Sequence, residues 1–453
     1  MKRLIETIKN IYKIEDLRIR IINTLFFVLI YRLGSFVVLP GIDPSQLTAL
    51  HKQTSDSLLG LLDMFSGGAF SNASIFALGI MPYISASIIV QLLGIAIPYF
   101  QKLQKEGESG RKKINQITRL LTIAVTAAQA PAYISNLVYR LPNDAITPFD
   151  PNITTPSVFF WVSTVIILVA GTVFVMWLGE KITDKGLGNG ISLIIMVGII
   201  ARLPFAMAAE FVSRLEEQGG GMVILLLEMV LIVFVIIGVI LLVQGTRRIP
   251  VQFAKRIVGN KQYGGARQYI PLKVNAAGVM PIIFAQAIMF IPITLAGFAK
   301  SDRVSGFVAA FADFTGFWYN LTFGLMIILF TYFYTAITIN PTQMADDMKK
   351  NGGFIPGIKP GRKTAEFIDN VMSRITLPGA IFLAIVAILP SIASLMGINS
   401  QFAQFYGGTT LLILVGVVLD TLQQIESHLL MRHYDGLMKS GRIKGRSSLS
   451  MTG

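Results

Sequence analysis

Few residues of this 453-residue chain are of a type that does chemistry. Cysteine is absent, so there is no thiol nucleophile, no thiolate metal ligand and no disulfide. Only three histidines occur, and His428 and His433 lie five residues apart beside Glu426, without the HExxH order of a zinc site. The glycine-rich stretch 185–190 (KGLGNG) lacks the spacing of a nucleotide-binding loop. We therefore expect no catalytic residue, no metal and no cofactor.

Only two ionisable residues, Arg32 and Glu228, lie away from the ends of the apolar stretches. Ion-coupled transporters keep such residues at membrane depth because they must bind an ion or a proton. One carboxylate that pairs with a cation is ordinary, so Glu228 gives little support to a proton relay. The other polar side chains here are neutral, which favours a wetted passage that fixes no ion. They are Ser85, Ser87, Gln91, Asn189, Ser192, Asn275 and Gln286. A secondary transporter for a small solute remains the alternative.

Long apolar stretches must position these residues. The chain is 53% hydrophobic and 14% charged, against roughly 25% charged residues in soluble domains, which excludes a soluble α/β enzyme and a disordered chain. A transmembrane helix needs about 20 apolar residues, and ten stretches meet that need. They are residues 21–39, 76–98, 118–138, 157–179, 190–209, 222–244, 276–297, 317–339, 375–396 and 408–428.

Basic residues are divided unequally between the two sides of these ten spans. With a cytoplasmic N-terminus, 32 of the 39 lysines and arginines lie on the cytoplasmic side, as the positive-inside rule requires. The opposite side is assigned six: Lys52, Arg140, Arg202, Arg214, Lys300 and Arg303; Arg32, in the first span, is the remaining one. Both termini are therefore expected in the cytoplasm. Residues 1–20 show no signal-cleavage pattern and predict an amphipathic helix on the membrane surface, while residues 429–453 form a cytoplasmic tail.

An unusual segment separates the first two spans. Residues 58–65 are apolar but too short to cross, and Gly67 and Gly68 interrupt them before a polar stretch begins. Irregular backbone at membrane depth must be buried in protein or line a cavity. The pattern predicts a short, half-inserted helix that turns back into the span at 76–98, with an interfacial loop as the alternative.

The loop at residues 244–275 carries seven basic residues and no aspartate or glutamate. One interpretation is that it only obeys the topology rule. The other is a docking surface for a large anionic partner, such as ribosomal RNA or an acidic motor domain. The residues of this loop leave both interpretations open.

Several long motifs, in chain order, carry a resemblance to a known family. They are ALGIMPYISASIIVQLL (77–93), WLGEKITDKGLGNGISLII (177–195), and the stretches 244–256, 271–285, 340–361 and 406–412. The chain resembles the SecY family, the central subunits of the bacterial protein-conducting channel. The resemblance implies an all-α multi-pass membrane protein with ten transmembrane helices in two inverted, pseudo-symmetric halves, residues 21–209 and 222–428.

The resemblance also implies roles for residues that spacing alone does not mark, because isoleucines in membrane helices usually face lipid. A pore ring at the waist would consist of Ile80, Ile84, Ile195, Ile199, Ile283 and Ile413. A plug, at about residues 58–72, would contain Leu62, Asp63, Met64, Phe65, Gly67, Gly68 and Asn72. A lateral gate between the second and seventh spans, with the third beside it, would be lined by Ser85, Ser87, Gln91, Gln286 and Ile291.

The function that the resemblance implies is a pore that moves unfolded polypeptides across the bacterial cytoplasmic membrane and releases hydrophobic segments sideways into the lipid bilayer. No covalent chemistry is needed, because a partner supplies the energy. The implied partners are SecE-like and SecG-like small membrane subunits, a SecA motor ATPase, the ribosome through its RNA, signal sequences and nascent polypeptides, with SecDF and YidC as further candidates.

The implied docking surface lies on the cytoplasmic loops 244–275 and 340–374. Its basic residues are Arg247, Arg248, Lys255, Arg256, Lys359, Arg362 and Lys363. One position departs from the family pattern, because Lys359 stands where bacterial members have the arginine of IRPG. Lysine keeps the charge but loses the bidentate fork, so Arg362 or Lys363 is expected to take over any paired contact with a carboxylate.

Overall fold

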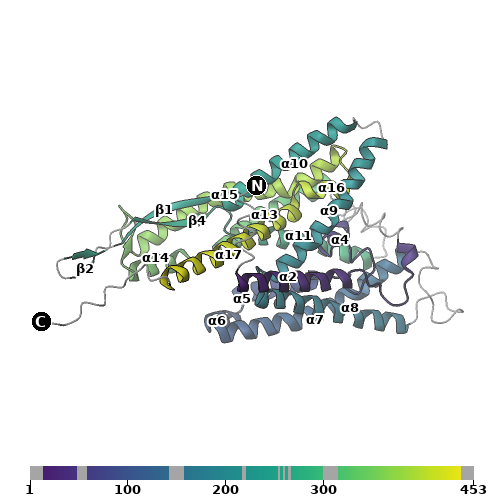
Figure 1. Cartoon of the computed structure of the whole chain (residues 1–453), viewed down its shortest axis with the longest axis horizontal. Coiled ribbons are helices and arrows are strands. Elements are labelled where there is room, and N and C mark those ends of the chain that lie inside the picture. Colours follow the sequence, from purple (N-terminus) through teal and green to yellow (C-terminus); the bar gives the residue numbers. More distant parts are fainter. Residues whose placement is uncertain are drawn as a thin grey trace.

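The computed structural model describes residues 14–47, 59–141, 158–216, 221–253, 256–258, 261–263, 267–298 and 315–439. A helix lies at each of the ten predicted spans (Figure 1). These are α2 (Glu15–Gly34), α5 (Met81–Ala96), α7 (Glu108–Arg140), α8 (Val158–Lys185), α9 (Gly190–Glu216), α10 (Gly221–Gln244), α11 (Met280–Phe298), α13 (Phe317–Thr338), α15 (Arg362–Leu395) and α17 (Gly408–Lys439). Seven of them are long and apolar enough to cross a membrane, and α5 with its bent continuation makes an eighth.

Helix ends depart from the predicted spans for physical reasons. Helices α7 and α15 begin at Glu108 and Arg362, well before their apolar stretches, because hydropathy detects only the part of a helix that suits hydrocarbon. Helix α5 ends at Ala96 because Ile97 precedes a proline and is extended. The next helix, α6 (Pro98–Lys105), departs at 103°.

Two expectations for the chain ends need correction. Residues 15–20 are the first turns of α2 and not the end of a separate surface helix; most of the predicted helix at 1–20 lies outside the described residues. At the other end, α17 continues to Lys439, which is well into the predicted tail. Arg202 and Arg214, which the sequence analysis counted with the outer side, both lie within α9.

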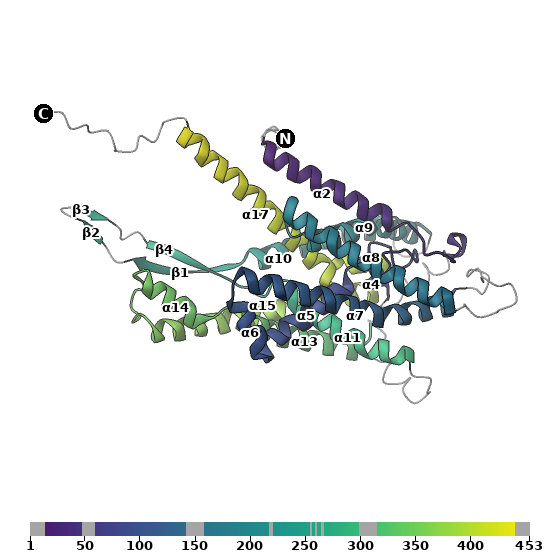
Figure 2. The same cartoon turned by 90° about the horizontal axis from the view of Figure 1, so that it is seen from below.

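The helices pack as two groups. In the first, α5 lies against α7, α7 against α8, and α8 against both α2 and α9. In the second, α13 lies between α11 and α15, and α17 packs on α15 and α10. The groups meet along α9, which contacts α10 and α17, and along α11, which contacts α7 (Figures 1 and 2). The multi-pass helical fold class is therefore confirmed.

A small sheet projects from one end of the helices, which hydropathy did not predict (Figure 2). Strand β1 (Thr246–Phe253) pairs antiparallel with β4 (Arg267–Lys273), and β5 (Gly353–Phe354) joins the other edge of β1. Strands β2 (Arg256–Val258) and β3 (Lys261–Tyr263) form a hairpin at the tip. Ile249 and Val251 alternate inward and pack near Ile368 of α15. The short helix α14 (Pro341–Lys350) lies against α15 beside the sheet.

A buried ionic cluster joins the two groups of helices. The Arg214 guanidinium of α9 donates to Glu210, one turn earlier, at 2.8 Å and to Glu228 of α10 at 2.5 Å. Both glutamates are buried, with at most 4% of each residue exposed. Glu210 also accepts from the Asn399 backbone N–H at 2.7 Å, next to α16 (Ser400–Ala403). Glu228 is therefore a paired carboxylate, which is the ordinary interpretation that its position in the sequence favoured.

Replacement of Arg214 by leucine would leave two buried carboxylates without their cation. Removal of one partner of a buried ion pair typically costs about 3–5 kcal/mol. We expect a loss of this size in the free energy of unfolding of Arg214→Leu, measured by denaturant titration in detergent micelles. The control is Arg362→Leu, because Arg362 pairs with Glu366 while its side chain is 94% exposed, and exposed pairs contribute about 0–1 kcal/mol. Equal losses in both variants would contradict the prediction.

Candidate functional site

The six isoleucines of the expected ring belong to one hydrophobic cluster. Ile80 lies at the start of α5 and Ile84 one turn later, Ile195 and Ile199 lie on α9, Ile283 on α11 and Ile413 on α17. Four of them are at most 4% exposed, and Ile84 and Ile283 are half-buried. The same cluster also contains Met64 and Phe65. The general expectation that membrane isoleucines face lipid is thus wrong for these positions.

The segment at residues 59–80, called here the inserted segment, supplies Met64 and Phe65. It starts with the short helix α4 (Leu59–Phe65) and continues as turns up to the start of α5. The predicted short helix followed by irregular, buried backbone is what the structure shows. The Leu62 side chain and residues 48–58 lie outside the described part. Asn72 is half-buried, and its N–H donates to the Gly68 carbonyl at 3.0 Å.

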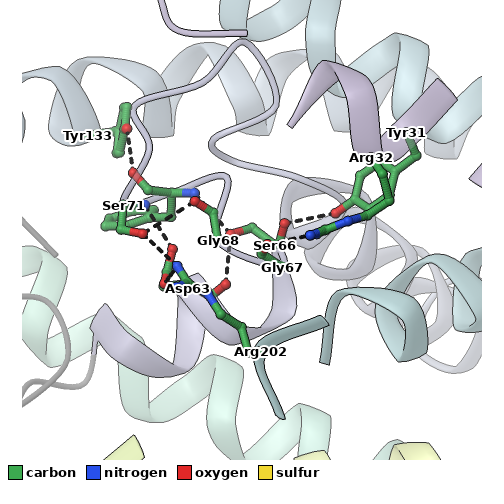
Figure 3. Close-up of polar contacts among 10 residues, drawn as sticks. Tyr31, Arg32, Asp63, Ser66, Gly67, Gly68, Ser71, Tyr133 and Arg202 are labelled. Carbon is green, nitrogen blue, oxygen red and sulfur yellow. Dashed lines mark hydrogen bonds and ion pairs between the residues drawn. The ribbon is translucent and has the colours of Figure 1, made fainter. Parts of the chain in front are cut away.

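Neighbouring helices donate hydrogen bonds to the backbone of the inserted segment (Figure 3). From α2, the Tyr31 hydroxyl donates to the Ser66 carbonyl at 3.0 Å, and Arg32 donates to the Gly67 carbonyl at 2.9 Å. From α7, the Tyr133 hydroxyl donates to the Phe70 carbonyl at 2.9 Å. Arg32, the isolated arginine of the first span, therefore satisfies a buried backbone carbonyl.

An ion pair adds a contact from α9 (Figure 3). Arg202 pairs with Asp63 and also donates to the Ser71 hydroxyl at 2.7 Å. The Ser71 backbone N–H donates to Asp63 Oδ1 at 2.8 Å. Sequence reasoning missed Arg202 because it was placed outside the membrane. The available signal was one arginine inside the predicted span 190–209 and one aspartate inside the expected plug, two opposite charges that each require a partner.

Two glycines allow the inserted segment to touch α9 backbone to backbone. Gly67 has φ +65°, and a Cβ atom there would lie 2.7 Å from the Gly198 Cα. A Cβ atom on Gly198 would in turn lie 3.0 Å from the Phe65 carbonyl oxygen. Gly68, at φ +94°, lies against the Arg202 guanidinium. The interruption seen in the sequence is therefore a close contact as well as a turn.

The expected gate residues are divided between described and undescribed side chains. Ser85, Ser87 and Gln91 are half-buried along α5, and Gln91 donates to the Ser87 hydroxyl at 3.4 Å. Gln286 is buried on α11. The Ile291 side chain lies outside the described part of α11. Helix α7, the third span, is the main described contact of α11 in the first group of helices.

The expected docking residues gather at the end that carries the sheet. Arg247 and Arg248 are exposed on β1, and Lys359, Arg362 and Lys363 are exposed where α15 begins. Lys255 and the Arg256 side chain lie outside the described residues. Within the described ranges, no three His, Cys, Asp or Glu side chains form a group that could hold a metal.

Comparisons with known proteins agree on one family. The family model described as SecY matches residues 74–422. Protein translocase subunit SecY of Mycobacterium tuberculosis is 44% identical over 443 residues, which cover 94% of this chain and 97% of that protein. A solved SecY structure has a TM-score of 0.61 at 17% identity, and the match covers 96% of this chain and 95% of that chain. It is described as showing that the plug domain stabilises the closed channel and maintains a membrane seal. Sec61 in the canine ribosome–channel complex has a TM-score of 0.56 at 16% identity, with the same coverage.

The contact between Gly67 and Gly198 predicts the effect of a methyl group. In Gly67→Ala, the new Cβ must displace the inserted segment from α9, in addition to the cost of positive φ, about 1–2 kcal/mol. The matched control is Gly352→Ala, because Gly352 has φ +70° with no atom within 4 Å of a Cβ. We expect the free energy of unfolding to fall by at least about 1 kcal/mol more in Gly67→Ala, as overpacking costs about 1–3 kcal/mol. Equal losses would show that the close contact does not matter.

Proposed function

The chain belongs to the SecY family, and we propose that its central cluster is the seal of the resting channel. The chain is a multi-pass membrane protein, and it is the protein-conducting channel subunit of a translocase, not an enzyme or a small-solute transporter. In the proposal, the six isoleucines form the ring that closes the pore, and the inserted segment is the plug. The observation that supports it most is that the isoleucines of four separate helices belong to one apolar cluster with Met64 and Phe65 of α4.

Aliphatic side chains suit both tasks of such a ring. A narrow apolar waist loses its water and so holds back ions. The same side chains make no directional bonds, so they fit loosely around any residue of a passing polypeptide. Met64 and Phe65 add apolar surface from the plug to the same cluster. When the plug leaves, the ring has to seal around the translocating chain.

A lateral gate between α5 and α11, with α7 beside it, is the proposed exit to lipid. The apolar core of a signal sequence, about 7–15 residues, gains free energy by leaving a wet pore for the bilayer. Along α5, the hydroxyls of Ser85 and Ser87 and the amide of Gln91 provide neutral polar groups that exchange hydrogen bonds with water when the seam opens. Gln286 is the proposed counterpart on α11.

The projecting sheet and the start of α15 form the proposed docking surface for cytoplasmic partners. The related Sec61 structure is a ribosome–channel complex, and ribosomal RNA is a polyanion that exposed arginines attract. A SecA-like motor would use the same surface to supply energy. In this proposal, the sheet and both termini lie on the cytoplasmic side of the bacterial cytoplasmic membrane. SecE-like and SecG-like subunits lie beside the helices.

Replacement of the ring should make the resting channel leak ions. The variant carries glycine at Ile80, Ile84, Ile195, Ile283 and Ile413, and we expect a large rise in conductance across planar bilayers because the waist becomes wide enough to hold water. The control carries glycine at five exposed isoleucines, Ile166, Ile237, Ile381, Ile385 and Ile392, and should stay sealed. A tight seal in the ring variant would overturn the assignment.

Charge reversal at Arg247 and Arg248 should weaken ribosome binding. Each lost phosphate contact reduces the slope of log affinity against log salt by about one, so binding should be measured at several salt concentrations. Lys112→Glu with Lys113→Glu, which also reverses two exposed charges but on α7, is the control and should change the slope less. Reversal of Lys359 should chiefly impair secretion driven by the motor ATPase. Unchanged ribosome affinity and slope after reversal of both arginines would argue against this surface.

A further inference from the structure

We propose that Arg202 is a positioning residue that latches the plug, and that its ion pair with Asp63 sets how readily a weakly hydrophobic signal sequence opens the channel. The inference rests on the proposed role of the inserted segment as plug. It adds a specific side-chain contact that determines the balance between the closed and open states.

The contact is a closed arrangement of charged and polar groups. Asp63 accepts from Arg202 through one carboxylate oxygen and from the Ser71 N–H through the other, at 2.8 Å. Arg202 also donates to the Ser71 hydroxyl at 2.7 Å, which itself donates to the Gly68 carbonyl at 3.3 Å. The guanidinium lies against Gly68, where a Cβ would be only 2.8 Å from Nη2. One side chain of α9 thus holds both the helix and the turn of the plug (Figure 3).

This contact differs in kind from the others that hold the segment. Tyr31, Arg32 and Tyr133 donate to backbone carbonyls, which any plug sequence would offer. The Arg202–Asp63 contact requires a particular side chain on each partner, and hydrogen bonds between ionised groups are about twice as strong as neutral ones. Among these polar contacts, it is therefore the one that the sequence of the plug itself can strengthen or weaken.

The pair is also placed so that it can separate. The side chains of Arg202 and Asp63 are 24% and 12% exposed, unlike Glu210 and Glu228 in the buried cluster, whose side chains are 1% and 5% exposed. Partial exposure lets water reach both charges when they part. The Glu210–Arg214–Glu228 cluster, by contrast, suits a permanent connection. Opening of the plug breaks the first contact and leaves the second intact.

The test uses Arg202→Gln, Asp63→Asn and the double variant in the full-length chain, reconstituted with its translocase partners. The double variant leaves no unpaired charge and is close in shape to the original pair. We expect each single variant to raise the resting ion conductance about tenfold, the change that loss of one charge-assisted hydrogen bond produces. In the double variant, the fold-increase in resting conductance should be smaller than the product of the fold-increases in the two single variants, because the residues act as a pair. Arg202→Lys, which keeps the charge, should recover part of the seal.

A second measurement separates a latch from general damage. Translocation of a substrate whose signal sequence has a shortened apolar core should increase in Arg202→Gln, whereas a damaged channel would translocate every substrate less. The control pair is Arg119 and Glu180, which joins α7 to α8 by a bidentate contact; Arg119→Gln should change neither measurement. The latch would be overturned if Arg202→Gln translocated every substrate less and the double variant lost translocation to the same extent.

The ring variant with five glycines serves as the reference for a leaking channel. If it leaks while Arg202→Gln and Asp63→Asn remain sealed and do not accept the weak signal, the latch is overturned and the proposed seal stands. If none of these variants leaks, the proposed seal is overturned as well, and the latch with it. Leakage in the single variants with non-additive behaviour in the double variant supports both.

Discussion

A peptide group that lacks a hydrogen-bond partner cannot be left in hydrocarbon. This constraint is most severe for residues 66–80. They have no regular helix, yet most of them are buried. Their backbone is satisfied by turns, by the Leu39 N–H, which donates to the Ala73 carbonyl, and by the Val37 carbonyl, which accepts from Ile75. The carbonyls of Ser66, Gly67 and Phe70 also accept from side chains of α2 and α7. The arrangement of the first group of helices follows from the need to surround this segment.

The inserted segment is held in place by both polar contacts and apolar packing. Its polar side and backbone are held by Tyr31, Arg32 and Arg202, whereas Met64 and Phe65 belong to the apolar cluster of the ring. The polar contacts are directional and determine position. The apolar contacts exclude water and tolerate sliding. Movement of the segment must break both sets together, so a resting channel that is sealed is also one in which the plug is correctly placed.

The ten helices could be predicted because hydropathy reports directly on burial in lipid. The direction in which a side chain faces could not, since apolar residues suit lipid and protein interior equally well; the ring isoleucines came from resemblance and not from spacing. The sheet at 246–273 was not predicted because apolar length and charge do not indicate strands; its signal is the alternation of buried residues at Ile249 and Val251. The pairing of Arg202 was not predicted because the residue was counted with the loops, whereas it lies inside α9.

Helix α9 is tied to the second group of helices near both of its ends. At one end, Arg214 joins Glu228 of α10. At the other, the Gly188 N–H, just before α9, donates to the Gln424 side chain of α17 at 2.8 Å. Two groups of helices that are pinned along one edge can move apart only along another. The contact of α11 with α7 forms that other edge, beside the proposed gate between α5 and α11. A lateral opening there therefore needs no break in the polar contacts of α9 with α10 and α17, and the latch at Arg202 can be released independently of it.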